Sequence, residues 1–269
     1  MTIAAAYLIS EGVAFGTDST TTVSTQRGVA QLFDYSQKLF EVGEHSRLGV
    51  CTYGAGSIKG TSHRTLVARL AKELDLEQVK VREAADTFSR IIYGEYGDGE
   101  DTGSVGYVLG GWDPDTHLPE CYHIYFAPRA LPTLESFSIG QASFYGCPEF
   151  FARVFHGFDS RLPDRLLEEL KKSGVKAEKD NFDSVFQAAF ESATAPLRTI
   201  GFRDLPIREA LDCIYMYLHI TIKAFKFRYG PPICGGPIEL AFISTDRPFR
   251  WVLHKDFARA IREVEAIIK

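Results

Sequence analysis

Apolar residues open the chain in two short runs. Within residues 2–9 and 12–18, the stretches Ile3 to Ile9 and Val13 to Gly16 are apolar at successive rather than alternate positions, and the turn Ser10-Glu11-Gly12 separates the two runs. A strand with apolar residues on both sides is typical of a sheet that is covered on both faces. The two runs therefore predict neighbouring strands in the middle of a layered domain.

Further strands are predicted where short apolar runs lie between turn residues. A polar stretch rich in Ser and Thr follows the first two runs, over residues 17–28. The predicted strands beyond it cover 38–42, 47–53, 105–112, 121–126, 134–139, 238–243 and 249–253.

Helices are predicted where apolar residues recur at every third or fourth position. Leu66, Leu70 and Leu74 form such a face in a helix over 61–74, and a second helix is predicted over 78–93. The chain from 147 to 228 is mostly helical in pattern. It includes a charged segment over 162–172 and a long apolar one over 207–227, and a last amphipathic helix is predicted over 255–267.

The order of these elements predicts an α/β-layered protein with antiparallel sheets, because strands come in runs and helices in pairs rather than in βαβ alternation. The chain has 269 residues, of which 45% are hydrophobic and 24% charged, so a folded, soluble protein is expected. We expect a single domain over residues 1–269, enlarged by a helical insertion at about 157–205.

Charge and composition exclude several classes of function. The formal charge is −5, which leaves no basic surplus for binding nucleic acid. No apolar run reaches the roughly 20 residues that span a bilayer, and the first residues lack the pattern of a signal peptide. The five cysteines are odd in number and scattered, as in reduced proteins of the cytoplasm. We therefore expect a cytoplasmic protein without a nucleic-acid or membrane partner.

Two segments could in principle bind a metal ion. His117, Cys121 and His123 straddle one short strand without the spacing of a zinc site, and the loop 94–103 is acidic but typical of a solvated loop. We expect neither a metal nor another cofactor.

A glycine-rich turn, Gly54 to Gly60, follows a predicted strand and opens a helix, as a dinucleotide-binding turn would. The next element is a second helix, however, and no parallel strand with an acidic end follows. A dinucleotide-binding enzyme is therefore the third of our functional hypotheses.

The N-terminus carries a stronger pattern, because Thr2 follows the initiator Met directly. Once Met1 is removed, Thr2 would combine a hydroxyl nucleophile with a free α-amine, whose pKa of about 7.7–8.0 suits it as the base. Such a site needs a cation that lowers this pKa, an anion that holds the cation, and a backbone N–H for the oxyanion. Lys38, Asp18 and Gly54, respectively, are placed to supply these groups.

In this order the motifs resemble those of proteasome-type N-terminal nucleophile (Ntn) hydrolases. The resemblance rests on Thr2, Gly12-Val13, Gly16-Thr17-Asp18-Ser19 and the Lys38 strand, and it continues through the motifs Gly49 to Gly56, Val108 to Asp113, Phe137 to Gly140 and Gly235 to Leu240. It covers about 1–150 and 206–255, and the segment Ile139 to Gly146 is closest to the bacterial Anbu branch.

The resemblance implies a four-layer α-β-β-α sandwich of two antiparallel sheets that self-assembles into rings or helical stacks. It also implies that Thr2 is nucleophile and base, Lys38 the cation, Asp18 its partner and Gly54 the oxyanion donor. The supporting positions differ from the family pattern: Gln141 stands where typical members have Ser, with Ser143 two residues on, and Cys234 replaces a second Ser. Ser19 completes the supporting set.

The leading hypothesis is thus a threonine-type hydrolase of peptides or other amides that uses Thr2 and no cofactor. The second is a catalytically weak or inactive assembly subunit of the same family, because the residues that support the N-terminal amine have changed.

Overall fold

The computed structural model describes residues 2–25, 28–100, 102–158, 161–176, 178–194, 201–230 and 233–255. The chain divides into two compact units, one formed by Met1–Cys147 with Gly201–Lys269 and the other by Pro148–Ile200. The first unit contains the sheets and the N-terminus, and the second contains three helices of the segment that the sequence predicts to be helical.

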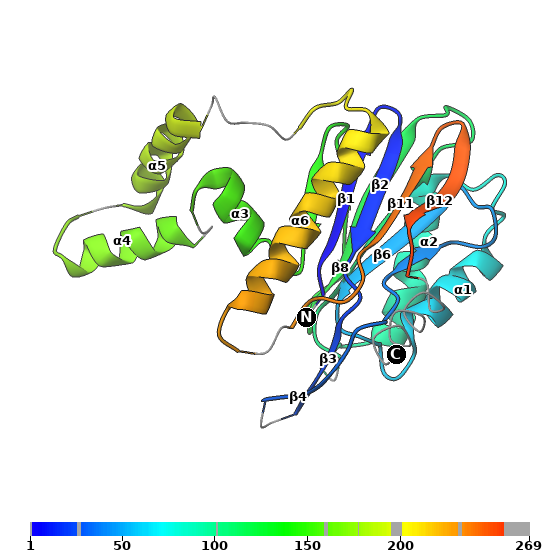
Figure 1. Ribbon diagram of the computed structural model, residues 1–269, viewed down its shortest axis with the longest axis horizontal. Helices are drawn as coiled ribbons and strands as arrows, with labels where there is room; N and C mark the ends of the chain where they lie inside the picture. Colours follow the sequence, from blue (N-terminus) through cyan, green and yellow to red (C-terminus); the bar gives the residue numbers. More distant parts are fainter. Residues whose placement is uncertain are drawn as a thin grey trace, which may run out of the picture. The chain divides into compact units, whose positions relative to one another are not determined.

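Two five-stranded antiparallel sheets form the first unit (Figure 1). The first sheet has the order β10-β1-β2-β11-β12, with bounds Ala142–Tyr145, Ala4–Ile9, Gly12–Thr17, Glu239–Ser244 and Arg247–Leu253. The second sheet has the order β5-β6-β7-β8-β9, with bounds Leu39–Glu41, Leu48–Gly54, Val105–Trp112, Pro119–Phe126 and Thr133–Ser136. A separate hairpin joins β3 (Thr21–Thr25) to β4 (Gly28–Phe33).

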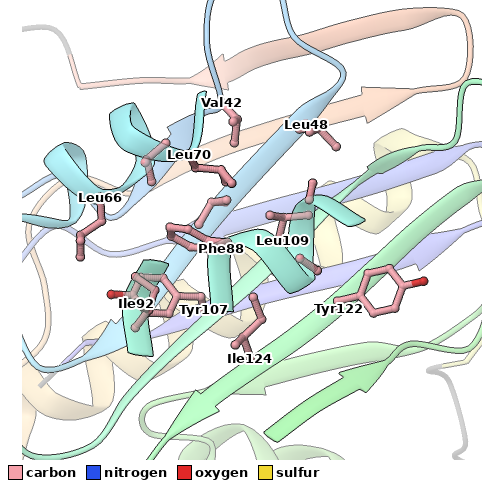
Figure 2. Packing of buried hydrophobic residues seen from close by; sticks show 14 of the residues in the cluster. Val42, Leu48, Leu66, Leu70, Phe88, Ile92, Tyr107, Leu109, Tyr122 and Ile124 are labelled. Carbon is pink, nitrogen blue, oxygen red and sulfur yellow. The ribbon is translucent and has the colours of Figure 1, made fainter. Parts of the chain in front are cut away.

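Helices α1 (His63–Glu73) and α2 (Val81–Tyr96) cover one face of the second sheet. Leu66 and Leu70 of α1 and Phe88 of α2 pack against Tyr107 and Leu109 of β7 in a buried hydrophobic cluster (Figure 2). Ser62 caps α1, because its side chain accepts a hydrogen bond from the backbone N–H of Thr65. The apolar residues that recur with the helical period in the sequence are thus the ones that pack against the sheet.

The other face of the second sheet packs against the first sheet. Alternate residues of β1, such as Ala6 and Leu8, lie in one core cluster with Val108 of β7 and Cys121 of β8. This packing explains why the first run of the sequence is apolar on both sides: every residue of β1 and of β2 is buried.

Helix α6 (Ile207–Phe227) covers the remaining face of the first sheet, where it crosses β1 and β2 in Figure 1. A Cβ atom at Gly16 would lie 2.4 Å from the Cγ2 of Ile214 and 2.9 Å from the Cδ1 of Leu218. A larger residue at this position would have to displace these side chains, so glycine favours the close approach of the helix to β2.

The second unit contains α3 (Glu149–His156), α4 (Leu162–Lys172) and α5 (Lys179–Thr194). Phe158 packs edge-on against Phe186 and Phe190 of α5, with ring centroids 5.3 and 5.1 Å apart. These aromatic side chains therefore form a small core in the second unit.

The mixed α/β class with antiparallel sheets is confirmed, and the predicted helices over 162–172 and 207–227 match α4 and α6 in both bounds. The pattern did not predict the β3–β4 hairpin or β10, while the predicted helix over 255–267 lies almost wholly outside the described residues. None of the described helices combines the length and apolar character needed to cross a membrane.

Candidate active site

Thr2 lies just before β1 and is only 7% exposed. The next residue, Ile3, donates its N–H to Oδ1 of Asp18 at 3.1 Å and accepts the N–H of Asp18 on its carbonyl at 3.2 Å. On the other side, a Cβ atom at Gly146 would lie 1.7 Å from the carbonyl oxygen of Thr2. Thr2 is thus held between the end of β2 and a glycine that no other residue can replace without displacing it.

The predicted Lys38–Asp18 pair is present and buried. Asp18 directly follows β2 and Lys38 directly precedes β5, which brings the two sheets' ends together at this point. The Nζ of Lys38 lies 2.6 Å from Oδ1 of Asp18, with the residues 4% and 0% exposed, and it also donates to the carbonyl oxygen of Thr20 at 2.5 Å. Oδ2 of Asp18 accepts the N–H of Gly235 at 3.0 Å. Asp18 therefore ties the start of β1, the Lys38 ammonium and the Gly235 turn together.

Burial lowers the pKa of Lys38, and the attraction of Asp18 opposes this effect. A second ammonium, that of Lys255, also lowers the pKa of Lys38. Lys38 consequently gives up its proton more easily than an exposed lysine does.

A second buried ion pair, which the sequence did not predict, lies beside the first. Lys255 donates from Nζ to Oε2 of Glu239 at 2.9 Å and to the carbonyl oxygen of Ser36 at 2.9 Å. Glu239 begins β11 and is completely buried. A glutamate within the apolar run Pro237 to Ala241 was the signal for it, because a buried carboxylate needs a partner.

A cavity of about 420 Å³ opens between these pairs and the start of α1. Thr2, Lys38 and Lys255 line it, together with His63 and Arg64 at the N-terminal end of α1. The remaining lining residues are Thr21, Tyr35, Ser36, Gln37, Phe40, Thr52, Tyr53, Ala55, Gly56 and Ser62. Thr2 and the predicted cation therefore share one space that is large enough for a side chain or a short segment of substrate.

Gly54, the predicted oxyanion donor, ends β6 in a left-handed conformation with φ of 92° and does not line this cavity. The next residues, Ala55 and Gly56, do line it. Ala55 donates its N–H to the carbonyl oxygen of Ser104 at 3.0 Å. Gly56 is thus the glycine of this turn that borders the cavity.

The structure brings two of the four supporting residues to the site. Ser19 is buried and donates from Oγ to the carbonyl oxygen of Pro237 at 2.7 Å, while its own Oγ is 3.4 Å from Nζ of Lys255. Cys234 is buried next to the ion pair: burial and the charge of Asp18 raise the pKa of its thiol, so it stays neutral. Ser19 therefore contributes a neutral group beside Lys255, and Cys234 one beside the Lys38–Asp18 pair.

Gln141 and Ser143 lie elsewhere. Ser143 stands opposite Ala6 in the ladder between β1 and β10, and Gln141 donates to its Oγ at 3.0 Å. Because Ser143 pairs with the middle of β1, it is several residues away from Thr2. Gln141 follows Gly140, whereas the glycine that contacts Thr2 is Gly146.

His63 faces the cavity from the first turn of α1 as a neutral group. Its ring nitrogens lie 2.9 Å from the hydroxyl of Tyr107 and 2.8 Å from the carbonyl oxygen of Ala55, and burial lowers its pKa. These contacts fix the ring in place, so His63 shapes the wall and does not carry charge.

Neither cofactor alternative gains support from the described residues. No three His, Cys, Asp or Glu side chains in them converge on a point where a metal ion could bind, and His123 instead lies 2.8 Å from the hydroxyl of Tyr53. Every pair of strands described is antiparallel, so the turn Gly54 to Gly60 is not part of a parallel βαβ unit.

Comparison with known proteins identifies the fold. No protein-family model and no curated protein matches the sequence. Among solved structures, an Anbu (Gly-1) mutant from Hyphomicrobium sp. strain MC1 matches with a TM-score of 0.56 and 12% identity, covering 100% of this chain and 98% of the other. Anbu (ancestral beta-subunit) from Yersinia bercovieri matches with a TM-score of 0.53 and 14% identity over 98% and 96% of the two chains. The predicted resemblance to the Anbu branch of the proteasome-type Ntn hydrolases is thus confirmed at the level of the fold.

Proposed function

We propose that this protein is a threonine-type amide-bond hydrolase in which Thr2, freed of Met1, is the nucleophile. The observation that carries the proposal is that Thr2 and Lys38 line the same cavity, and that Lys38 pairs with the buried carboxylate of Asp18. Met1 itself lies outside the described residues. We further propose the four-layer α-β-β-α order of helices and sheets that such hydrolases have.

In the proposed reaction the α-amine of Thr2 takes the hydroxyl proton, and Oγ attacks the carbonyl carbon of the amide. The ammonium of Lys38 lowers the pKa of that amine, and Asp18 holds Lys38 in position. The leaving amine takes the proton, and water then hydrolyses the ester on Thr2 by the same path in reverse. The N–H of Gly56 is our candidate for the oxyanion donor, in place of the predicted Gly54, because Gly56 borders the cavity.

A peptide epoxyketone tests this proposal, because its stable adduct needs both the hydroxyl and the free amine of an N-terminal threonine. Intact mass should show loss of Met1 and gain of one inhibitor, and peptide mapping should place the adduct on Thr2. The Thr2→Ala variant should not react, whereas the Thr2→Ser variant should. Thr133→Ala is the matched control, since Thr133 is exposed on β9, does not line the cavity and should leave the reaction unchanged. An adduct elsewhere, or none on protein with a free Thr2 amine, would refute the proposal.

A second candidate is an assembly subunit with little or no catalysis. It is favoured by Cys234, since a buried neutral thiol is a poor hydrogen-bonding partner for an N-terminal amine. In that case the Lys38–Asp18 pair would serve only to anchor the start of β1. A protein with free Thr2 that neither reacts with the epoxyketone nor hydrolyses peptides would favour this candidate. Under both candidates we expect cytoplasmic homo-oligomers, as rings or helical stacks, which light scattering can detect.

A further inference from the structure

The charged side chains that line the Thr2 cavity are all basic. Lys38, Lys255 and Arg64 contribute to the lining, and no Asp or Glu is among the described residues that do. The two nearby carboxylates lie behind the lysines: Asp18 and Glu239 are both completely buried. The charged groups that a bound molecule would contact in the cavity are therefore cations.

The two lysines each have a carboxylate partner, whereas the guanidinium of Arg64 has none among the described residues. Lys38 and Lys255 each bind a buried carboxylate and a backbone carbonyl oxygen. Arg64 is exposed, donates to Oε1 of Gln37 and lies over the ring of Phe40, and it forms no ion pair within the described part of the chain. Its planar fork of N–H donors therefore remains available for a carboxylate from outside.

The neighbouring acidic residue does not neutralise Arg64. Glu41 borders an adjoining hollow that Arg64 also lines, but it accepts the N–H of Ser46 at 3.0 Å on the side chain. Burial raises the pKa of Glu41. Arg64 is also the second residue of α1, a helix whose first turn carries no acidic residue, so the helix dipole adds to the positive potential.

We propose that the cavity selects substrates with a carboxylate beside the scissile amide, such as peptides with an acidic side chain there, and that Arg64 binds this carboxylate. This inference rests on the proposed function, because the bound molecule is a substrate only if the protein is a hydrolase. The recognition itself needs only the cavity, so it can be tested without turnover.

Binding is measured by calorimetry on the Thr2→Ala protein, with acetyl-Ala-Ala-Ala-Glu-amide and its neutral isostere that ends in Gln-amide. We expect the acidic peptide to bind about tenfold more tightly, which corresponds to about 1.4 kcal/mol. The preference should shrink at high salt and vanish when Arg64→Gln is added. Arg69→Gln is the matched control, because Arg69 lies on the same helix and pairs with Glu95 outside the cavity lining. Equal binding of the two peptides, or a preference that survives Arg64→Gln, would overturn the proposal.

Turnover by the mature wild-type protein separates this inference from the proposed function. If aminocoumarin derivatives of both peptides are hydrolysed equally well, the inference fails and the function stands. If neither is hydrolysed while the binding preference is found, the function fails and the carboxylate site stands. A charge reversal, Arg64→Glu, should transfer the preference to a peptide that ends in Lys-amide.

Discussion

Replacing Asp18 by Asn would remove the charge that balances the most deeply buried lysine of the site. Asp18 is completely buried, and its carboxylate accepts hydrogen bonds from Lys38 at 2.6 Å, from Ile3 at 3.1 Å and from Gly235 at 3.0 Å. An asparagine has the same shape, but the NH2 group that replaces one carboxylate oxygen cannot accept a hydrogen bond. At least one of the three donors would therefore face another donor. The variant therefore loses both a charge and a hydrogen bond.

We expect Asp18→Asn to lower the free energy of unfolding by about 3–5 kcal/mol at pH 7, the usual cost of leaving a buried charge without its partner. With a denaturant slope of about 3 kcal/mol/M, this is a fall of about 1–1.7 M in the urea midpoint. Unfolding can be followed by the fluorescence of Trp112 and Trp251 at a fixed protein concentration.

The pH dependence of this loss has a definite sign. Burial holds the pKa of Lys38 below its ordinary value, and loss of Asp18 removes the attraction that opposes this effect. As the pH rises through that lowered pKa, Lys38 becomes neutral and no longer needs a counter-charge. The difference between Asp18→Asn and the wild type should therefore shrink at alkaline pH.

Two controls make the reasoning refutable. Asp86→Asn breaks an exposed pair with Arg82, in which both side chains are 55% exposed, and should cost less than about 0.5 kcal/mol. Adding Lys38→Met to Asp18→Asn removes the unbalanced charge and should restore part of the lost stability. An Asp18→Asn midpoint within about 0.3 M of the wild type would mean that the pair is not a buried ion pair in solution.

Three further changes test other contacts of the site. Gly146→Ala should lower the urea midpoint strongly and abolish reaction at Thr2, because its methyl group would lie 1.7 Å from the Thr2 carbonyl oxygen. Stability should fall as the pH drops below about 6.5, since the lowered pKa of His63 lets only the unfolded chain take up a proton in that range. Glu239→Gln should cost about 1–3 kcal/mol in urea unfolding, less than Asp18→Asn, because Lys255 is 12% exposed and partly reaches water.

Matched variants separate these effects from general damage. Gly60→Ala also places a side chain at a positive φ, but nothing lies within 4 Å of its Cβ, so a loss as large as that of Gly146→Ala would contradict the steric argument. The acid sensitivity should weaken in His63→Gln and persist in His219→Gln, where the histidine is exposed. Glu73→Gln, which breaks an exposed pair with Arg90, should leave the midpoint almost unchanged, and an equal loss for Glu239→Gln and Glu73→Gln would show that burial is not the cause.

The secondary structure of this chain was largely predictable where the pattern was long and regular. Helices α4 and α6 coincide with the charged segment and the long apolar segment of the predicted helical region, and the two-sided apolar runs of β1 and β2 indicated a sheet covered on both sides. The β3–β4 hairpin was missed because Ser and Thr are typical of loops as well as of strands. The short strand β10 was missed since its pairing with β1 comes from contacts more than 130 residues apart in sequence.

The order of residues in the chain was enough to predict Thr2, Asp18 and Lys38 as site residues. Each lies at the start or end of an apolar run, and together they supply a nucleophile, an anion and a cation. Which groups surround them depends on how distant segments meet. Gly146 contacts Thr2, and Lys255 pairs with Glu239, only because β10, β11 and β12 lie in one sheet with β1. The basic character of the cavity likewise arises where α1 meets the ends of two sheets. Local periodicity is read along the chain, whereas burial, ion pairing and the shape of a cavity are properties of packing, which only the folded structure decides.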